Sequence, residues 1–530
     1  MALIKSILTV GGGTAISRVL GFVRDILIAR FLGASMMADA FFVALRFPNL
    51  FRSLFAEGTL NVAFVPLLSG ELHEKGPKHA RVFARSVFSF LFYVLLIFTV
   101  VMEILMPNLM FLFAPGFEDI AGKLTLTTTL SRITFPFLLC VSLVSLFAGM
   151  LNAVGKFWAA AFTPTILNAV MILSLFVITP FINNPYAPAY ALSYGVLIAG
   201  LIEFCFLLWH VRKAGLAIGL INPIRALCHV SAGVKTLLRK MAPGVLGSGV
   251  YQINLFFDTL LVSFVGAGAI SWLNYAHHLF QLPIGIIGTA IGTALLPVLS
   301  RHIKMRELEQ ATTQLNRALE ISLAMSTASM VGLMCLAEPI VRILFERGAF
   351  TSDDSLHTAL ALIVFAIGLP AYMLTKTVSP FFYARGDTST PVKIAVIGVI
   401  LNAVLAIILM QFWGYIGIAL ATGIVVWINA GQYIVRLYLK GDVCLDKLAR
   451  YRLPRILVSA VIMGVFLNIS QMILTYYFPH WRTQSSVFSG IVLFGLIGMA
   501  VCVYGCSIIL TKSVVWQDVK SLLRRSKSDK

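Results

Sequence analysis

Charged residues are scarce in this sequence. Only 12% of its 530 residues are Asp, Glu, Lys or Arg, against roughly 25% in a typical soluble domain. No hydrophilic stretch is long enough to form a soluble catalytic or nucleotide-binding domain, and no G-x-x-x-x-G-K-[ST] phosphate loop is present. We therefore expect no cofactor, and we expect that any transport draws on a coupling cation or on the membrane potential.

Cysteine is also infrequent. The seven cysteines fall mostly inside apolar runs, which predicts free buried thiols rather than a metal or disulfide framework. Cys502 and Cys506 lie one helical turn apart and are expected to be small packing residues. The first residues lack a small-residue cleavage site after a compact apolar stretch, so we expect an uncleaved first helix.

Apolar residues are abundant. They make up 59% of the chain, the mean hydropathy is +0.91, and they occur in runs of about 20 residues, the length that spans a bilayer as a helix. The sequence predicts an all-α polytopic membrane protein with about fourteen spans. These are 6–31, 36–70, 83–112, 127–153, 158–181, 187–211, 241–265, 269–299, 313–337, 356–384, 390–411, 414–438, 454–476 and 486–511.

Basic residues fall unequally on the two sides of these spans. With the N-terminus in the cytoplasm, thirty Lys and Arg residues lie in inner segments and six lie within spans. Only five are in outer segments. This asymmetry follows the positive-inside rule and predicts that both termini are cytoplasmic. The net charge of +19 then faces an anionic inner leaflet and requires no nucleic-acid partner. The five outer residues are Lys123, Arg132, Arg342, Arg347 and Arg482.

The chain carries a weak internal repeat. A shift of about 233 residues aligns Asp25 with Asp258, and a shift of 234 aligns Leu167-Asn-Ala-Val170 with Leu401-Asn-Ala-Val404. Because six helices is an even number, both copies would enter the membrane from the same side, as in transporters that carry substrate between two parallel halves. The predicted divisions are a six-helix lobe at 1–222, a second at 223–445, and two added helices with a basic tail at 446–530.

Six basic residues lie inside predicted spans, where a cation costs several kcal/mol unless it faces an interior cavity. Five of them are in the first two spans, accompanied by acidic residues and one asparagine. On an ideal helix Asp39, Arg46 and Glu57 share one face, and Arg52 lies off it unless Pro48 redirects the following turns. The residues concerned are Arg18, Arg24, Asp25 and Arg30 on the first span, Asp39, Arg46, Asn49, Arg52 and Glu57 on the second, and Lys376.

These two spans hold more positive than negative charge. Five arginines against three acids leave about two positive charges, which a dianionic group such as a diphosphate would neutralise. The alternative is that the arginines form internal ion pairs that clamp the two helices together, with Arg30 extending to the outer surface.

The second half is less charged. Asp258, with Asn254 one turn away, could hold a coupling cation or make a hydrogen-bonded helix contact. His277 and His278 could protonate on contact with a phosphate. For Glu203 and Lys376 the sequence suggests no partner.

Several motifs closely resemble those of the MurJ (MviN) family of lipid II flippases, and the resemblance covers nearly the whole chain. The most specific block lies in the first two spans, and other motifs follow along the chain. They are Ser17-Arg-Val-Leu-Gly-Phe-Val-Arg-Asp25, Ala38-Asp-Ala-Phe-Phe-Val-Ala44, Pro48-Asn-Leu-Phe-Arg52, Phe55-Ala-Glu-Gly58, Ala161-Phe-Thr-Pro-Thr-Ile-Leu-Asn168, Leu282-Pro-Ile-Gly285, Leu296-Pro-Val-Leu-Ser300 and Tyr383-Ala-Arg-Gly-Asp-Thr-Ser-Thr-Pro-Val-Lys393.

The resemblance implies a fourteen-helix fold of the multidrug/oligosaccharidyl-lipid/polysaccharide exporter superfamily in the bacterial cytoplasmic membrane. It implies movement of the undecaprenyl-diphosphate-linked disaccharide-pentapeptide, lipid II, from the inner to the outer leaflet for peptidoglycan synthesis. The family's cavity residues correspond here to Arg18, Arg24, Asp39, Arg52 and Glu57. Its basic residue on the eighth span corresponds to His278, which departs from the family's arginine. The last two spans would form a groove for the polyprenyl tail.

The expected partners are lipid II and membrane lipids. The chain is predicted to be a monomer, and the sequence does not decide whether it contacts other cell-wall synthesis proteins. An exporter of another polyprenyl-diphosphate-linked oligosaccharide remains an alternative, since the diphosphate would be the same. A membrane-embedded polyprenyl-phosphate transferase would need clustered carboxylates for magnesium. The one Asp-Asp pair in the chain, Asp353-Asp354, reads more simply as a helix N-terminus.

Overall fold

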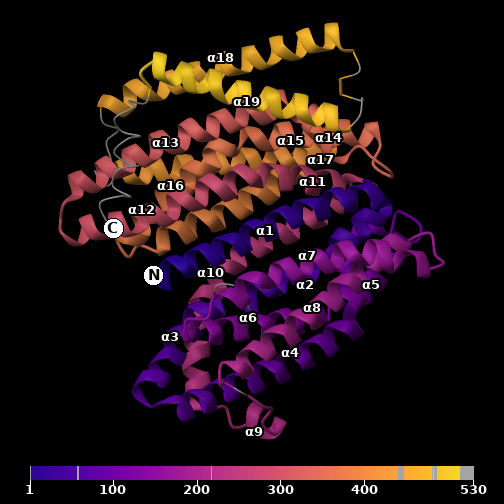
Figure 1. Cartoon of the computed structure of the whole chain (residues 1–530), viewed down its shortest axis with the longest axis vertical. Helices are drawn as coiled ribbons and strands as arrows, with labels where there is room; N and C mark the ends of the chain where they lie inside the picture. The colour runs from indigo at the N-terminus through magenta and orange to yellow at the C-terminus, as the bar shows by residue number, and fades with distance from the viewer. Residues whose placement is uncertain are drawn as a thin grey trace. The chain divides into compact units, whose positions relative to one another are not determined.

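The computed structural model describes residues 2–55, 59–216, 218–439, 447–479, 481–482 and 486–513, and its regular elements in these ranges are helices (Figure 1). Glu57, most of the basic tail and Cys444 lie outside the described residues. The elements up to residue 263 are α1 (Ala2–Leu32), α2 (Met36–Phe55), α3 (Thr59–Glu74), α4 (Pro77–Phe113), η1 (Pro115–Phe117), α5 (Lys123–Thr134), α6 (Phe137–Ala153), α7 (Trp158–Val177), η2 (Thr179–Phe181), α8 (Ala187–Lys213), α9 (Pro223–Leu227) and α10 (Ala232–Ser263).

The remaining elements are α11 (Ala269–Pro283), the π-helical turn η3 (Ile284–Gly288), α12 (Thr289–Lys304), α13 (Leu308–Cys335), α14 (Ala337–Phe345), α15 (Ser352–Ile367), α16 (Leu369–Ala384), α17 (Ser389–Leu439), α18 (Lys447–Tyr477) and α19 (Ser486–Leu510). Among the described residues nine helices are long and apolar enough to cross a membrane, or ten if α15 and α16, which meet at 41°, form one span. The all-helical membrane fold is as expected. The count of fourteen spans is consistent with these elements and stays a prediction.

Helix α17 contains two of the predicted spans. Its backbone leaves helical geometry at Gly414 (φ 54°, ψ −131°), a conformation that glycine tolerates best. The Arg436 guanidinium donates a hydrogen bond of 3.3 Å to the Thr390 carbonyl, although a straight helix would separate these residues by about 70 Å. The chain therefore reverses at Gly414, and α17 is a pair of antiparallel helices.

Helix boundaries repeat at the spacing that the sequence repeat predicts. Helix α4 and the pair α13–α14 begin 231 residues apart, at Pro77 and Leu308, and end 232 residues apart, at Phe113 and Phe345. The break between α5 and α6 recurs between α15 and α16, and the connection from α7 to α8 corresponds to the reversal of α17. These matching interruptions support an internal duplication.

The chain divides into two compact units by its contacts. The N-terminal unit comprises Met1–Ser271 with Arg347–Phe350, and the C-terminal unit comprises Trp272–Glu346 with Thr351–Lys530. Within the N-terminal unit α1 packs on α7, α7 on α8 and α2 on α5, while α10 packs on α2, α3 and α4. The repeat predicted a lobe boundary at residues 222 and 223. By contacts α10 belongs to the first unit, because its partners are there.

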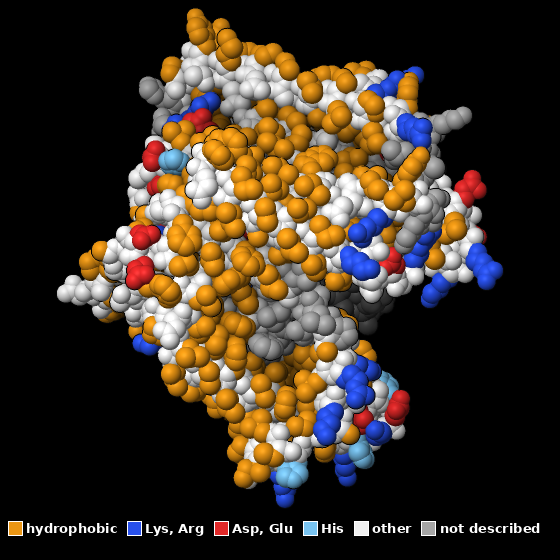
Figure 2. Space-filling view, turned by 180° about the vertical axis from the view of Figure 1, so that it is seen from behind, with side chains coloured by type: hydrophobic (Ala, Val, Ile, Leu, Met, Phe, Trp, Pro, Cys, Tyr) orange, Lys and Arg blue, Asp and Glu red, His pale blue; other side chains and the backbone are white. Residues whose placement is uncertain are grey.

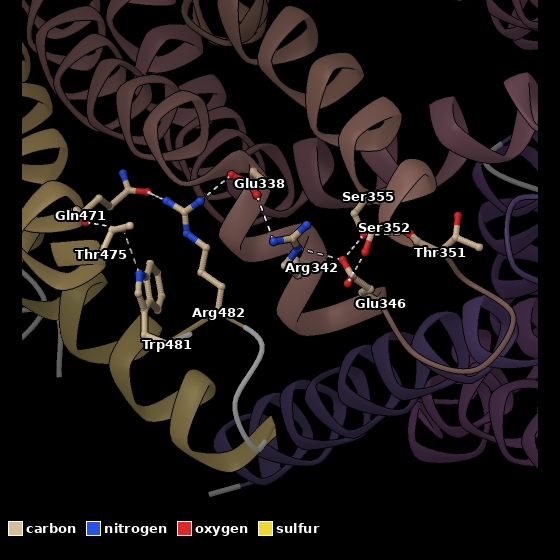
Figure 3. A network of polar contacts seen from close by, with 10 residues as sticks. All are labelled: Glu338, Arg342, Glu346, Thr351, Ser352, Ser355, Gln471, Thr475, Trp481 and Arg482. Carbon is tan, nitrogen blue, oxygen red and sulfur yellow. Dashed lines mark hydrogen bonds and ion pairs between the residues drawn. The ribbon is translucent and has the colours of Figure 1, made fainter. Parts of the chain in front are cut away.

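In the C-terminal unit ion pairs fix helix α18 and the connection that follows it. Arg452 on α18 donates a 2.8 Å hydrogen bond to Glu320 on α13, and both side chains are almost fully buried. At the other end of α18, Arg482 contacts Glu338 on α14 at 2.8 Å (Figure 3). The positive-inside rule assigned Arg452 to an inner segment and Arg482 to an outer one. The two arginines lie near opposite ends of α18, and each pairs with a glutamate from another helix.

Figure 3 also shows that the Arg482–Glu338 pair belongs to a larger network of polar contacts. Arg342 lies between Glu338 and Glu346, at 3.4 and 2.9 Å, and Ser352 and Ser355 donate to Glu346. These bonds join α14, α15 and the connection after α18. The predicted helix N-terminus at Thr351 is confirmed, because Thr351 and Asp354 form a capping box.

Large apolar side chains remain exposed on many helices, and Figure 2 shows them covering much of the visible surface. Such surface is expected where helices meet lipid. The six described cysteines are free, as predicted. The expectation that they are buried is wrong for Cys205, Cys228, Cys502 and Cys506, which are exposed at the protein surface.

Candidate functional site

The Arg24 guanidinium on α1 is held by one carboxylate and one carboxamide. Its Nε and one terminal nitrogen donate to a single Asp25 oxygen at 3.1 and 2.7 Å, and the other terminal nitrogen donates to Asn168 Oδ1 at 2.9 Å. The expectation of an unmatched charge at Arg24 does not hold, because Asp25 is its counter-ion. The side chain is 19% exposed, so it is fixed and still reachable.

Asn168 on α7 orients this arginine. Its amide nitrogen donates to the Ser17 carbonyl at 3.0 Å, so its oxygen is turned toward Arg24. The close approach depends on Gly21, where an added Cβ would lie 3.4 Å from the Asn168 amide. In the sequence, Asn168 belongs to the repeat and to a family motif, and it was not predicted to be a site residue. Its recurrence at the equivalent position of the second copy was the sequence feature that could have identified it.

Arg52 near the end of α2 lies close to Glu203 on α8, and the two charges attract one another. Glu203 is only 3% exposed, and its carboxyl group lies near the backbone of Leu167, next to Asn168. Sequence reasoning left Glu203 without a partner. The redirection of Arg52 by Pro48 stays a prediction. Residues 167 and 168 of α7 therefore lie between the surroundings of Arg24 and Arg52.

Asp39 is completely buried and belongs to a structural cluster. It accepts a 2.8 Å ion pair from Lys123, which is also fully buried. It also accepts bonds from the backbone N–H groups of Gly268 and Ser271 and from the Ser271 hydroxyl, at 2.7, 2.9 and 2.6 Å. The expectation that Asp39 contacts substrate does not hold in this structure, because its acceptors are occupied by protein donors at the start of α5 and α11.

Arg46 and Asn49 on α2 make local and interhelical bonds. Arg46 donates to the Thr259 hydroxyl on α10 at 2.8 Å, so Asp39 and Arg46 both point toward the segment formed by α10 and the start of α11. This agrees with the face that the sequence predicted for them. Asn49 donates to the Leu45 carbonyl of its own helix.

The other predicted residues are more dispersed. Arg18 is exposed on α1, and Arg30 is exposed near the end of the same helix. Asp258 on α10 accepts a 2.9 Å bond from Asn254, one turn earlier on the same helix. Among the described residues no group of three or more His, Cys, Asp or Glu could hold a metal ion. His278, on α11, lies half-buried in the C-terminal unit, and Lys376 on α16 lies 5.8 Å from the Tyr372 ring.

The intramembrane charged residues that the sequence singled out in this unit, taken together with Lys123, carry a net positive charge. They comprise six cations and four carboxylates, an excess of two, which Glu57 would reduce to one if counted. The predicted excess thus persists with two unforeseen members, Lys123 and Glu203. The cations are Arg18, Arg24, Arg30, Arg46, Arg52 and Lys123, and the carboxylates are Asp25, Asp39, Glu203 and Asp258.

The geometry at Arg24 suits a polyoxyanion. A guanidinium carries five N–H donors, and three are used by Asp25 and Asn168, which leaves two. These donors are on a rigid planar fork in a partly buried setting, where charge-assisted bonds are stronger than in water. The arrangement is therefore suited to binding an oxyanion.

Comparison with known proteins identifies the family. The sequence profile described as "Lipid II flippase MurJ" matches residues 28–489. The chain belongs to the MurJ family. It is 42% identical over 465 residues to a probable lipid II flippase MurJ of Rhizobium tropici, covering 88% of this chain and 86% of that protein. It is 35% identical over 432 residues to a lipid II flippase MurJ of Burkholderia cenocepacia, covering 81% and 83%.

A solved structure of a MurJ in an inward closed conformation superposes with a TM-score of 0.76 at 27% identity, covering 97% of this chain and 99% of that one. An inward-facing multidrug transporter of the MATE family matches with a TM-score of 0.67 at 16% identity and 80% and 94% coverage, which concerns the fold alone. As a MurJ-family protein with nine or more apolar helices, the chain is a multi-pass protein of the bacterial inner membrane and a transporter rather than an enzyme.

This MurJ-family chain also contains a large apolar cavity within its C-terminal unit. The cavity measures about 570 Å³ and lies between α13, α16, α17 and α18. Leu323, Leu374, Trp427 and Leu457 are among its lining residues, and Arg450 is the charged residue in its wall. An apolar space of this kind accommodates a hydrocarbon chain, the ligand part that the family resemblance assigned to the last two spans.

Proposed function

We propose that this chain flips lipid II, the undecaprenyl-diphosphate-linked disaccharide-pentapeptide, from the inner to the outer leaflet of the cytoplasmic membrane. The observation that carries the proposal is the Arg24 guanidinium, held by Asp25 and Asn168 with two N–H donors left over. A diphosphate offers oxygens in the geometry that these donors match. Membership of the MurJ family supplies the identity of the lipid.

Arg18 and Arg52 complete the proposed diphosphate site. Arg18 precedes Arg24 on α1 and is exposed, and Arg52 is held near Glu203 on α8. Each fixed guanidinium lowers the energy of the diphosphate in a medium of reduced dielectric. No bond in the lipid needs to break. The polyprenyl tail would remain in lipid or in the apolar cavity beside α18 while its head group crosses.

Transport is proposed to proceed by alternating access, with the two repeated halves exposing the head group first inward and then outward. A coupling cation at Asp258 or the membrane potential would supply energy. His278 is proposed to contribute a second, protonation-dependent contact with phosphate in place of the family's arginine.

The test is a leaflet-resolved assay of lipid II in bacteria depleted of their own flippase. Expression of this chain is expected to restore outer-leaflet lipid II and growth. Restoration of an O-antigen-type lipid-linked sugar in a strain lacking that exporter, without restoration of lipid II, would contradict the proposal and support the alternative exporter. A useful control is the same chain with both Arg24 and Arg52 replaced by alanine, which should restore neither.

A further inference from the structure

An open cavity with a partly polar lining lies in the N-terminal unit, and none of the arginines of α1 and α2 lines it. It measures about 410 Å³ and lies between α4, the chain before α9, α9 itself and the start of α10. Its polar lining consists of Ser86, Arg225, His229 and Ser231. None of these residues takes part in the proposed diphosphate site, and the function proposed above gives the cavity no role.

The cavity is formed by a segment that is fixed to α4. The Arg85 guanidinium donates to the carbonyls of Gly219 and Leu220 at 3.1 and 2.9 Å. Tyr93 donates its hydroxyl to the Ile221 carbonyl at 3.0 Å, and the Ile221 N–H donates to Ser89. The connection between α8 and α9 is therefore tied along α4 at four points, so the cavity exists without a ligand.

The surroundings of the cavity are strongly positive. The stretch 212–240 contains six Lys and Arg residues and no Asp or Glu. No described carboxylate pairs with Arg225 or His229. Ser231 caps the 32-residue helix α10 by accepting a bond from the Val234 N–H, which leaves its own hydroxyl hydrogen available to donate. The cavity thus combines a guanidinium, an imidazole, a hydroxyl and the positive end of a long helix, all suited to an anion.

Apolar side chains beside the cavity indicate which anion. Leu220 and Ile224 flank it and are 45% and 65% exposed. Figure 1 places α9 beside α4 at the margin of the N-terminal unit. The charge asymmetry of the sequence predicts that this segment is on the inner side of the membrane. A ligand with a phosphate group and attached acyl chains would contact both the polar cavity and the apolar side chains beside it. Free phosphate would contact only the polar cavity.

We propose that the cavity between α4, α9 and the start of α10 binds the phosphate head group of an anionic phospholipid of the inner leaflet. Arg225 and His229 contact the phosphate oxygens, and Ser231 donates a further hydrogen bond. Leu220 and Ile224 contact the acyl chains. The volume suits a glycerophosphate head group, because ligand pockets commonly begin at about 300 Å³.

The experiment measures lipid binding to the purified full-length protein by native mass spectrometry. Phosphatidylglycerol, phosphatidylcholine and inorganic phosphate are titrated separately. The wild-type protein should retain one phosphatidylglycerol in preference to phosphatidylcholine, and Arg225→Gln should weaken the tightest phosphatidylglycerol site about fivefold. The double variant Arg225→Gln/His229→Gln should weaken it further. Arg239→Gln, which removes the same charge from an exposed position on α10 outside the cavity wall, should change the affinity less than twofold.

Equal weakening by Arg239→Gln would show that only the general positive charge matters and would overturn the proposal. Unchanged phosphatidylglycerol binding in the double variant would do so as well. Displacement of phosphatidylglycerol by inorganic phosphate at the same concentration would identify a free-phosphate site and reject the lipid. Thermal unfolding midpoints of the variants should match the wild type, since these side chains are exposed, and lipid II flipping is a separate readout that tests only the arginines of α1 and α2.

Discussion

Asp39→Ala is expected to destabilise the N-terminal unit by about 3–5 kcal/mol, the usual cost of removing one partner from a buried ion pair. Lys123 is fully buried, so it would be left with an uncompensated charge, and the N–H groups of Gly268 and Ser271 would lose their acceptor. Thermal unfolding of the detergent-solubilised protein should show a clear decrease in midpoint, and less protein should accumulate in the membrane.

Three comparisons separate this structural role from a role in binding substrate. Lys123→Met should also destabilise the protein, because it leaves Asp39 charged and buried. Asp39→Leu combined with Lys123→Met should recover part of the lost stability, since both charges are then absent. Asp39→Asn should be milder than Asp39→Ala, because the amide oxygen still accepts from the backbone. An Asp39→Ala protein with wild-type stability but no flipping activity would contradict the structural assignment.

Arg24→Ala is expected to abolish flipping while the protein still inserts in the membrane. A hydrogen bond to a charged group contributes about 1.5–3 kcal/mol, so the loss of a guanidinium that makes two contacts with diphosphate should reduce substrate affinity by more than tenfold. Arg24→Lys should retain the charge but not the planar fork, and we expect partial activity. Leaflet-resolved measurement of lipid II in flippase-depleted cells gives the readout.

Arg30→Ala is the matched control for Arg24→Ala. It removes the same side chain from the same helix, but Arg30 is exposed, and the bond that Ala349 makes to residue 30 uses its backbone carbonyl. Flipping should therefore be close to that of the wild type. The flipping activity of Asn168→Ala should lie between those of Arg24→Ala and Arg30→Ala, because Arg24 would keep its counter-ion but lose its bond to Asn168. Wild-type flipping by Arg24→Ala would reject the diphosphate role of Arg24.

Helical periodicity predicted which residues of α2 share a direction. Asp39 and Arg46 do point toward α10 and the start of α11. Periodicity within one helix could not identify the partners, because Lys123 and Glu203 are supplied by α5 and α8, and their positions depend on how those helices pack. The sequence placed Lys123 in an outer segment, and no sequence pattern indicates that it is buried against Asp39.

The repeat predicted more of the architecture than of the contacts. The structure has helix breaks at equivalent places in the two halves, such as those before Phe137 and Leu369, in agreement with the repeat. The repeat did not predict that α10, the first helix of the second copy, packs on α2, α3 and α4 of the first. Similar sequences specify similar helices, but the helix on which each one packs depends on side chains that the two copies do not share.

The most direct test of the account is binding of undecaprenyl diphosphate, which lacks sugar and peptide, to the purified protein. If the guanidinium groups of α1 and α2 bind the diphosphate, this lipid should compete with lipid II, and Arg24→Gln should weaken binding of both by more than tenfold while Arg30→Gln leaves them unchanged. Competition by the sugar-peptide head group alone, with undecaprenyl diphosphate ineffective and Arg24→Gln binding lipid II normally, would contradict it.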